Sequence, residues 1–222
     1  MASPTKKVKV RRKLNQVKMV GSGSASRLLK QVQDLEAAGD LLETKNAYQK
    51  LINEFSQSGE VMTCQKKAEE VNIKLLFSNT IIPKSTLYEI KPGDTLNKIA
   101  QEFKTTIDLL KKSNHLADDK ILPGRKIKVW TAPFNIMVDK SQNILILKTD
   151  EEIIKTYIVS TGKNNSTPTG NFKITSKLIN PTWFKAGAVV PAGSPENILG
   201  SRWLGLDLPG YGIHGTTEPQ SL

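Results

Sequence analysis

The chain has 222 residues, enough for one or two domains with cores of their own, and a formal net charge of +11. Hydrophobic residues make up 38% of it, a low share that favours several small modules over one large core. No run of about 18 apolar residues occurs, which excludes a membrane-spanning helix. The single cysteine, Cys64, excludes an internal disulfide. The two histidines, His115 and His214, lack the spacing of metal ligands, so neither a metal nor a cofactor is expected.

Residues 1–24 are predicted to form a basic flexible arm. Residues 1–20 hold seven lysines and arginines and no acid, so most of the net charge belongs to a tail rather than to a folded face. A Gly-Ser joint follows at 21–24. The arm would be a solvated tail, or a contact for nucleic acid or another anionic polymer. Polar residues interrupt the apolar character of 14–20, so no signal peptide is visible.

Residues 25–80 are predicted to be helical. Apolar residues recur at helical spacing in three stretches, separated by breaks at 38–40 and 56–59. The third stretch carries Val61, Cys64, Ala68, Val71 and Leu75. The Ala-Gly-Asp break, with Tyr48 opposite it, resembles a tetratricopeptide-type hairpin, and the alternative is a helical spacer or a bundle that docks a protein partner. Cys64 is expected to be ordinary core packing.

A module over residues 87–131 is predicted to run strand, helix, helix, strand. Tyr88 and Ile90 alternate as in a strand, and a Pro-Gly turn follows. Asp94 or Thr95 can cap a helix that begins at Leu96. A second helix and a final strand complete the pattern.

Four phrases of this module resemble those of the LysM family: Gly93-Asp94-Thr95-Leu96, Ile99-Ala100, Asn114 and Leu122-Pro123-Gly124-Arg125. The resemblance covers residues 88–130 and implies a βααβ fold that binds N-acetylglucosamine-containing glycans such as peptidoglycan strands. The residues that it places in the groove are Gly93, Asp94, Thr95, Leu96, Asn114, Leu122, Pro123 and Gly124. On the residues alone, Asp94, Thr95 and Asn114 could equally be caps and turn residues. His115 is expected to be a surface loop residue.

From residue 134 onward the pattern predicts short strands separated by turns. The expected strands are 134–138, 144–147, 153–160 and 171–176, which are rich in β-branched residues. Their spacing favours an antiparallel sandwich or barrel over a parallel sheet. The segment 162–170 would be either a substrate loop or a hairpin connection.

Four further phrases follow in order: residues 136–142 (IMVDKSQ), 157–172 (YIVSTG, then TPTGNF), 197–203 (NILGSRW) and 211–216 (YGIHGT). Together they resemble the L,D-transpeptidase (YkuD-type) catalytic domain over residues 133–222. The resemblance implies acyl transfer: a cysteine thiolate attacks a carbonyl of a peptidoglycan stem peptide and expels a terminal D-amino acid. An amine of a second stem then resolves the acyl-enzyme and makes a cross-link.

This chemistry needs a thiol, a base and donors for the oxyanion. The resemblance assigns the base to His214, in Ile-His-Gly, and places Tyr211, Gly215 and Trp203 at the substrate. Trp183, Phe184 and Trp203 would be either core residues or substrate-cap aromatics. The family nucleophile stands in a Ser-x-Gly-Cys-x-Arg phrase after the histidine, whereas the present sequence ends at Leu222. We therefore expect a catalytic domain cut before its cysteine, and a chain that is inactive alone.

The combined expectation is an α+β multidomain chain: arm, helical segment, LysM-like module and an incomplete antiparallel β domain. Its function would be that of a peptidoglycan L,D-transpeptidase, directed to the wall by the LysM-like module, with glycan strands and stem peptides as partners. The arm and the helical segment would add a contact with an anionic polymer or a protein. The alternative is a non-catalytic peptidoglycan-binding or scaffold protein. By resemblance, either would belong to the cell envelope or periplasm.

Overall fold

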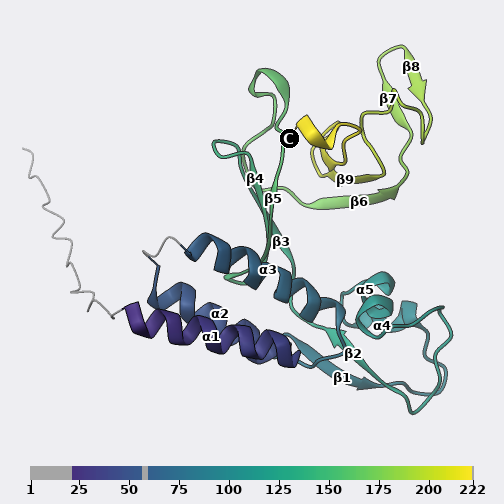
Figure 1. Cartoon of the computed structure of the whole chain (residues 1–222). Helices are drawn as coiled ribbons and strands as arrows, with labels where there is room; N and C mark the ends of the chain where they lie inside the picture. The colour runs from purple at the N-terminus through teal and green to yellow at the C-terminus, as the bar shows by residue number, and fades with distance from the viewer. Residues whose placement is uncertain (1–21, 57–59, 222) are drawn as a thin grey trace, which may run out of the picture. The chain divides into compact units, whose positions relative to one another are not determined.

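The computed structural model describes residues 22–56 and 60–221. They form two compact units, the first ending at Pro133 and the second beginning at Phe134. Figure 1 colours the first from purple to teal and the second from green to yellow. The first unit holds the α-helices and one strand pair, and the second holds antiparallel strands. The predicted α+β class is thus confirmed.

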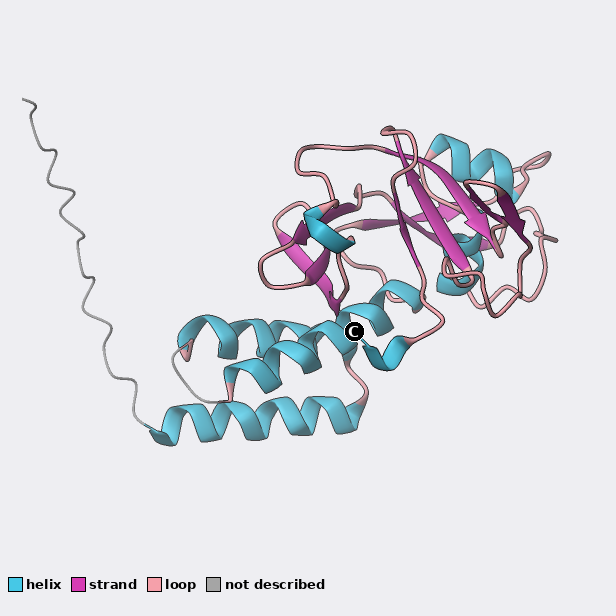
Figure 2. Ribbon diagram, turned by 90° about the horizontal axis from the view of Figure 1, so that it is seen from above, coloured by secondary structure: helices cyan, strands magenta, loops and turns pink. Residues whose placement is uncertain are grey.

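Three helices open the first unit: α1 (Ser22–Ala38), α2 (Leu41–Glu54) and α3 (Val61–Phe77). They lie side by side in both views, with α2 packed on each of the others (Figure 1, Figure 2). Because α1 begins at Ser22, it includes three residues that we expected in the Gly-Ser joint. Residues 1–21, which carry the predicted basic arm, lie outside the described part of the chain. None of the helices in the described part combines the length and apolar character that crossing a bilayer requires.

The helical segment packs through the apolar faces that the sequence predicts. Val32, Leu51 and Leu75 are each 1% exposed, and Cys64 is buried among them as core packing. Polar contacts support the same interface: the Tyr48 hydroxyl donates to Oε1 of Glu36 at 2.9 Å. The turn between α1 and α2 also forms where predicted, and the side chain of its last residue, Asp40, caps α2 by accepting from the Glu43 amide at 3.1 Å.

The second part of the first unit is a βααβ module made of β1 (Ser85–Glu89), α4 (Leu96–Glu102), α5 (Ile107–Ser113) and β2 (Lys126–Trp130). β1 and β2 pair antiparallel, from Ser85 opposite Trp130 to Glu89 opposite Lys126. Its core consists of Ile90, Leu96, Ile99, Ala100, Leu110, Ile127 and Val129. The predicted order of elements is therefore confirmed.

Lys128 joins the helical segment to this module. Lys128 lies on the face of β2 opposite to Ile127 and Val129, and it is only 1% exposed because the end of α3 covers that face. Its Nζ donates to the carbonyl oxygens of Leu75 at 2.7 Å and Ser78 at 2.9 Å, at the C-terminal end of α3. Burial lowers the pKa of Lys128 to about 8. The helical segment is thus packed against the module through a buried amine.

The second unit contains three antiparallel sheets. The first has the order β3 (Asn135–Asp139), β4 (Ile144–Thr149), β5 (Glu152–Ile158), and the second has the order β10 (Gly212–His214), β9 (Arg202–Leu206), β6 (Ile174–Ile179). The third is the hairpin of β7 (Trp183–Lys185) and β8 (Ala188–Val190). The predicted antiparallel pairing is confirmed, and the described strands form separate sheets rather than one closed barrel. Short 3-10 turns lie at Lys163–Asn165 and Pro219–Ser221.

Candidate active site and glycan-binding loops

The turn that follows β1 is built around Asp94. Its Oδ2 accepts hydrogen bonds from the Tyr88 hydroxyl and the Lys91 amide, each at 2.8 Å. These bonds hold the pKa of Asp94 below its usual range, and the bond to Asp94 raises the pKa of Tyr88 to about 12. Thr95 is the residue that caps α4, because its Oγ1 accepts from the Lys98 amide at 3.2 Å. Gly93 adopts φ +85°, the left-handed conformation that the turn requires.

The second predicted loop, residues 114–124, starts at the end of α5 and leads into β2. The Gly124 amide donates to the Ile90 carbonyl at 2.8 Å, and the Ile90 amide donates to the Arg125 carbonyl at 2.9 Å. These bonds extend the β1–β2 ladder, so both predicted loops adjoin the same end of the strand pair. Leu122 is 71% exposed, a high value for a leucine beside the turn after β1. The two loops therefore lie next to each other, and Leu122 presents an apolar side chain to solvent.

Two of the predicted glycan contacts have their side chains engaged inside the module. The amide of Asn114 donates to the carbonyls of Leu110 and Lys128, both at 2.8 Å, and its oxygen accepts from the Lys128 amide at 2.7 Å. A contact between Asn114 and a glycan would therefore have to use its backbone. Leu96 is 2% exposed and packs in the core. Asn114 thus fixes the position of the loop that it begins.

His214 is the exposed last residue of β10, and Trp203 of β9 lies opposite it in the ladder. The two rings stack with their centroids 5.9 Å apart and an interplanar angle of 16°. Nδ1 of His214 lies 2.7 Å from the Gly215 carbonyl oxygen. Since that oxygen can only accept, Nδ1 carries the proton in this contact, and Nε2 keeps the lone pair that a general base needs.

Two glycines leave the room that the indole of Trp203 occupies. Gly205 and Gly212 face each other across β9 and β10, and the indole lies against both of them. A Cβ on Gly212 would stand 2.4 Å from an indole carbon of Trp203, closer than real contacts allow. Tyr211, which directly precedes Gly212, is 39% exposed. The sequence did not decide whether Phe184 and Trp203 are core residues or substrate-cap aromatics. In the structure Phe184 is 75% exposed on β7, whereas Trp203 is half-buried and stacks on His214.

Gly215 packs against the turn at residues 197–201, which the sequence indicates only as part of the phrase at 197–203. Its amide donates to the Arg202 carbonyl at 3.1 Å, and a Cβ there would meet the Leu199 carbonyl oxygen at 3.3 Å. Asn197, 3% exposed, holds this turn: its amide donates to the Pro181 carbonyl at 2.8 Å, and its oxygen accepts from the Leu199 amide at 3.1 Å. The sequence signal for this turn was an asparagine, Asn197, that is followed two residues later by the pair Leu199-Gly200.

Within the 222 residues, no thiol accompanies this histidine. Cys64 is the single cysteine of the sequence and lies buried in α3 of the first unit. Burial raises the pKa of its thiol, which disfavours the thiolate that nucleophilic attack requires. The described residues contain no group of three or more acidic, cysteine or histidine side chains placed to hold a metal ion.

Replacing Gly212 with alanine is expected to destabilise the second unit by about 1–3 kcal/mol, because the new methyl group forces the indole of Trp203 off its position beside His214. Unfolding by urea and the ring resonances of His214 would measure the two effects. The same substitution should cost less in a Trp203→Phe background, whose smaller ring leaves room for the methyl group. An equal cost in both backgrounds would show that the contact with Trp203 is not the cause.

Comparisons with known proteins identify two domains of the chain. The family model of the LysM domain matches residues 88–130, and that of the L,D-transpeptidase catalytic domain matches residues 133–222. The class is therefore a protein that joins a LysM domain to an L,D-transpeptidase catalytic domain. More particularly, the chain belongs to the L,D-transpeptidase family, as the phrases of residues 133–222 predict.

Individual relatives agree with this assignment. The chain is 33% identical over 142 residues to the "Putative L,D-transpeptidase YkuD" of Bacillus subtilis, a match that covers 61% of this chain and 78% of that protein. It is 40% identical over 93 residues to the "Putative L,D-transpeptidase YqjB" of the same organism, covering 39% of this chain and 52% of the relative. The "Cell wall-binding protein YocH" of Bacillus subtilis is 45% identical over 56 residues, 25% of this chain and 20% of that protein.

Proposed function

We propose that the protein is a peptidoglycan L,D-transpeptidase that forms cell-wall cross-links and is directed to glycan strands by its LysM domain. The observation that carries the proposal is the geometry of His214. Its Nδ1 lies 2.7 Å from the Gly215 carbonyl oxygen, its ring stacks on Trp203, and the residue is exposed to solvent. This is the arrangement of an oriented general base.

In this mechanism Nε2 of His214 accepts the proton of a cysteine thiol, and the thiolate attacks a carbonyl carbon of a stem peptide. The C–N bond breaks as His214 returns its proton to the leaving nitrogen, which releases a terminal D-amino acid and leaves a thioester. The amine of a second stem peptide then attacks the thioester, gives up a proton, and regenerates the thiol. The products are one new amide cross-link and the original enzyme. Tyr211, Trp203 and Gly215 would line the path of the donor stem.

The nucleophile decides between this proposal and a non-catalytic one. Since Cys64 is buried, residues 1–222 alone would bind the wall without catalysis, as a peptidoglycan-binding or scaffold protein. Reading the gene beyond the codon for Leu222 separates the two. An in-frame Ser-x-Gly-Cys-x-Arg phrase shortly downstream is the result expected for the enzyme. A stop codon directly after Leu222 would leave only the wall-binding function.

We further propose that the protein acts in the cell envelope, where peptidoglycan strands and stem peptides are its partners. The LysM domain and the similarity to YocH, which is named a cell wall-binding protein, support this location. A contact of the N-terminal basic arm with an anionic polymer stays a prediction, because residues 1–21 lie outside the described structure.

Replacing Leu122 with serine is expected to weaken glycan binding about fivefold, the effect of losing about 1 kcal/mol of apolar contact. Because Leu122 is 71% exposed, the substitution should leave the fold intact. Calorimetric titration with a chitin oligosaccharide would measure the affinity. Met62 of α3, also 71% exposed, offers a matched control, since Met62→Ser removes an equally exposed apolar side chain outside the predicted loops.

The two variants separate a loop-specific effect from a general one. A loss of affinity in Leu122→Ser alone would support the groove between the loops. Equal affinities for the Leu122→Ser variant and the unmodified chain would place glycan binding elsewhere on the module.

A further inference from the structure

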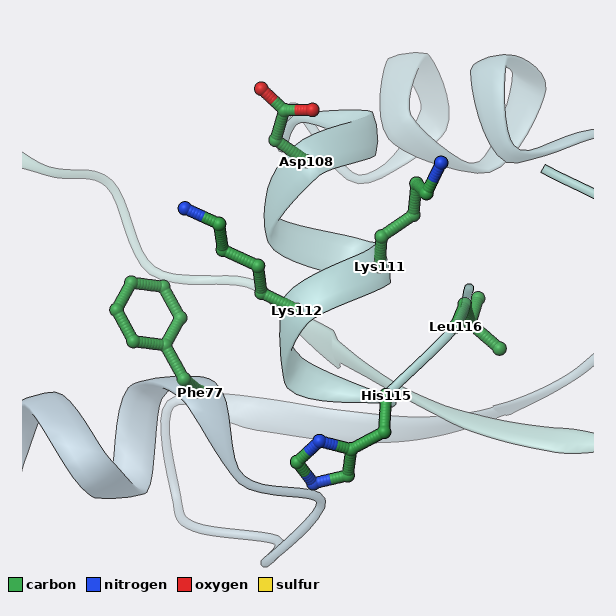
Figure 3. A pocket seen from close by; sticks show the side chains of 6 residues that line it. All are labelled: Phe77, Asp108, Lys111, Lys112, His115 and Leu116. Atoms are coloured by element: carbon green, nitrogen blue, oxygen red, sulfur yellow. The ribbon is translucent and has the colours of Figure 1, made fainter. Parts of the chain in front are cut away.

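A pocket lies where the C-terminal end of α3 meets α5 and the first residues of the loop that follows α5 (Figure 3). Its volume of about 590 Å³ falls in the range of small-molecule sites. The side chains that line it are Phe77, Asp108, Lys111, Lys112, His115 and Leu116. The helical segment therefore contributes a wall to a pocket whose other wall belongs to the LysM domain.

The position of Phe77 against α5 is fixed by the buried amine described above. Phe77 stands between Leu75 and Ser78, whose carbonyl oxygens accept hydrogen bonds from Lys128 at 2.7 and 2.9 Å. Lys128 belongs to β2, and the Asn114 side chain bonds to its backbone. The aromatic wall and the start of the loop after α5 are thus tied to the same residue. A pocket held this way is largely preformed, which reduces the entropic cost of binding.

The pocket places positive charge and a hydrogen-bonding ring around an aromatic face. Nζ of Lys112 lies 5.3 Å from the centroid of the Phe77 ring, a cation–π distance. In Figure 3 the side chains of Lys112 and His115 extend to the side of α5 on which Phe77 lies. Lys111 extends to the other side and pairs with Asp119 at 2.6 Å. One carboxylate, Asp108 in the first turn of α5, also lines the pocket.

The pocket adjoins the predicted glycan groove, because His115 directly follows Asn114 at the start of the second loop. Its backbone there is left-handed, with φ +52°. A glycan of N-acetylated sugars is neutral, whereas the stem peptides that branch from peptidoglycan strands carry carboxylates. An ammonium group and an imidazole beside an aromatic ring suit a carboxylate of such a peptide.

We infer that the pocket of Phe77, Lys112 and His115 binds a carboxylate of a stem peptide next to the glycan held by the LysM loops. The inference rests on the proposed function, since it assumes that those loops bind a glycan strand. It assigns the helical segment a role in recognising peptidoglycan that still carries its peptides. The domain would then prefer stem-bearing strands over bare glycan.

The test compares two soluble probes of the same glycan length: a chitin oligosaccharide, and a peptidoglycan fragment with stem peptides. Replacing Lys112 with glutamine is expected to weaken binding of the stem-bearing fragment about threefold to fivefold, the effect of an exposed charge pair. Binding of the chitin oligosaccharide should stay unchanged. Phe77→Leu, which keeps an apolar side chain, should lower the same affinity and spare the same control probe.

Lys66→Gln supplies the matched control, because Lys66 is also exposed and lies on α3 about 16 Å along the helix from Phe77. Amidation of the stem carboxylates should abolish the difference between Lys112→Gln and the unmodified chain. An equal loss for both probes, or a loss that persists after amidation, would overturn the carboxylate assignment. Competition by inorganic phosphate without any preference for the stem-bearing fragment would also overturn it. If the unmodified chain binds neither probe, the proposed glycan-binding function itself fails.

Discussion

Replacing His214 with glutamine is expected to slow acyl transfer about a hundred- to ten-thousandfold in a gene product that carries the family cysteine. Glutamine can keep a hydrogen bond to the Gly215 carbonyl, but its amide cannot accept the thiol proton. Release of the terminal D-amino acid and formation of the cross-linked product, both followed by mass spectrometry, would measure the rate.

Cys64→Ala provides the control for this experiment. Cys64 is buried in α3 of the first unit, so its removal should leave the rate of acyl transfer unchanged. A His214→Gln enzyme that works within about threefold of the unmodified one would contradict the role of His214 as general base, since base catalysis contributes far more than that.

The second large effect is a pH dependence that originates in Lys128. Burial lowers its pKa from 10.5 to about 8, so between these values the native amine is neutral while the unfolded one is protonated. The unfolded state then binds more protons, and the free energy of unfolding rises with pH across this window, by up to about 3 kcal/mol. Below about pH 8 both states are protonated, and the contribution of Lys128 is constant. A neutral amine can still donate to the Leu75 and Ser78 carbonyls.

Urea unfolding of the unmodified chain and of Lys128→Met between pH 7 and pH 10 would test this, given that methionine approximates the lysine stem without titrating. The helical circular dichroism signal reports on the first unit, because the described α-helices all belong to it. The stability of the unmodified chain relative to the variant is expected to rise with pH. Lys126→Met, at a neighbouring strand position with a 60% exposed side chain, should show no such change. Parallel pH curves for the unmodified chain and Lys128→Met would refute the buried-amine interpretation.

Much of the fold could be predicted because its signals are local. Apolar spacing places the three helices of the first segment, and the turn phrase at 92–95 places the start of α4, where Thr95 provides the cap. Alternation of β-branched residues likewise marks the strands β3 to β5. One boundary differs from the prediction: α1 begins within the Gly-Ser segment, since neighbouring turns can extend a helix through residues of low propensity.

In the candidate site, too, the sequence predicts single residues but not the contacts between them. The Ile-His-Gly phrase predicts His214 as the base, but the contacts around its ring join residues distant in sequence. The indole of Trp203 lies across Gly205 and Gly212, and Asn197 bonds to Pro181. Such contacts depend on which strands pair, and a sequence pattern does not specify the partner of a buried polar group.

The sequence by itself determined the α+β class and the order of the LysM and transpeptidase-type domains, because helical periodicity, turn residues and family phrases are written within short stretches. It also predicts His214 as the base. Only the tertiary structure decided that Lys128 is buried, that Asn114 bonds inward, and that Phe77 forms a wall beside α5. The physical reason is that burial and hydrogen-bond partners arise from packing between segments. A lysine on a strand is solvated until another element covers it, and here the end of α3 does so.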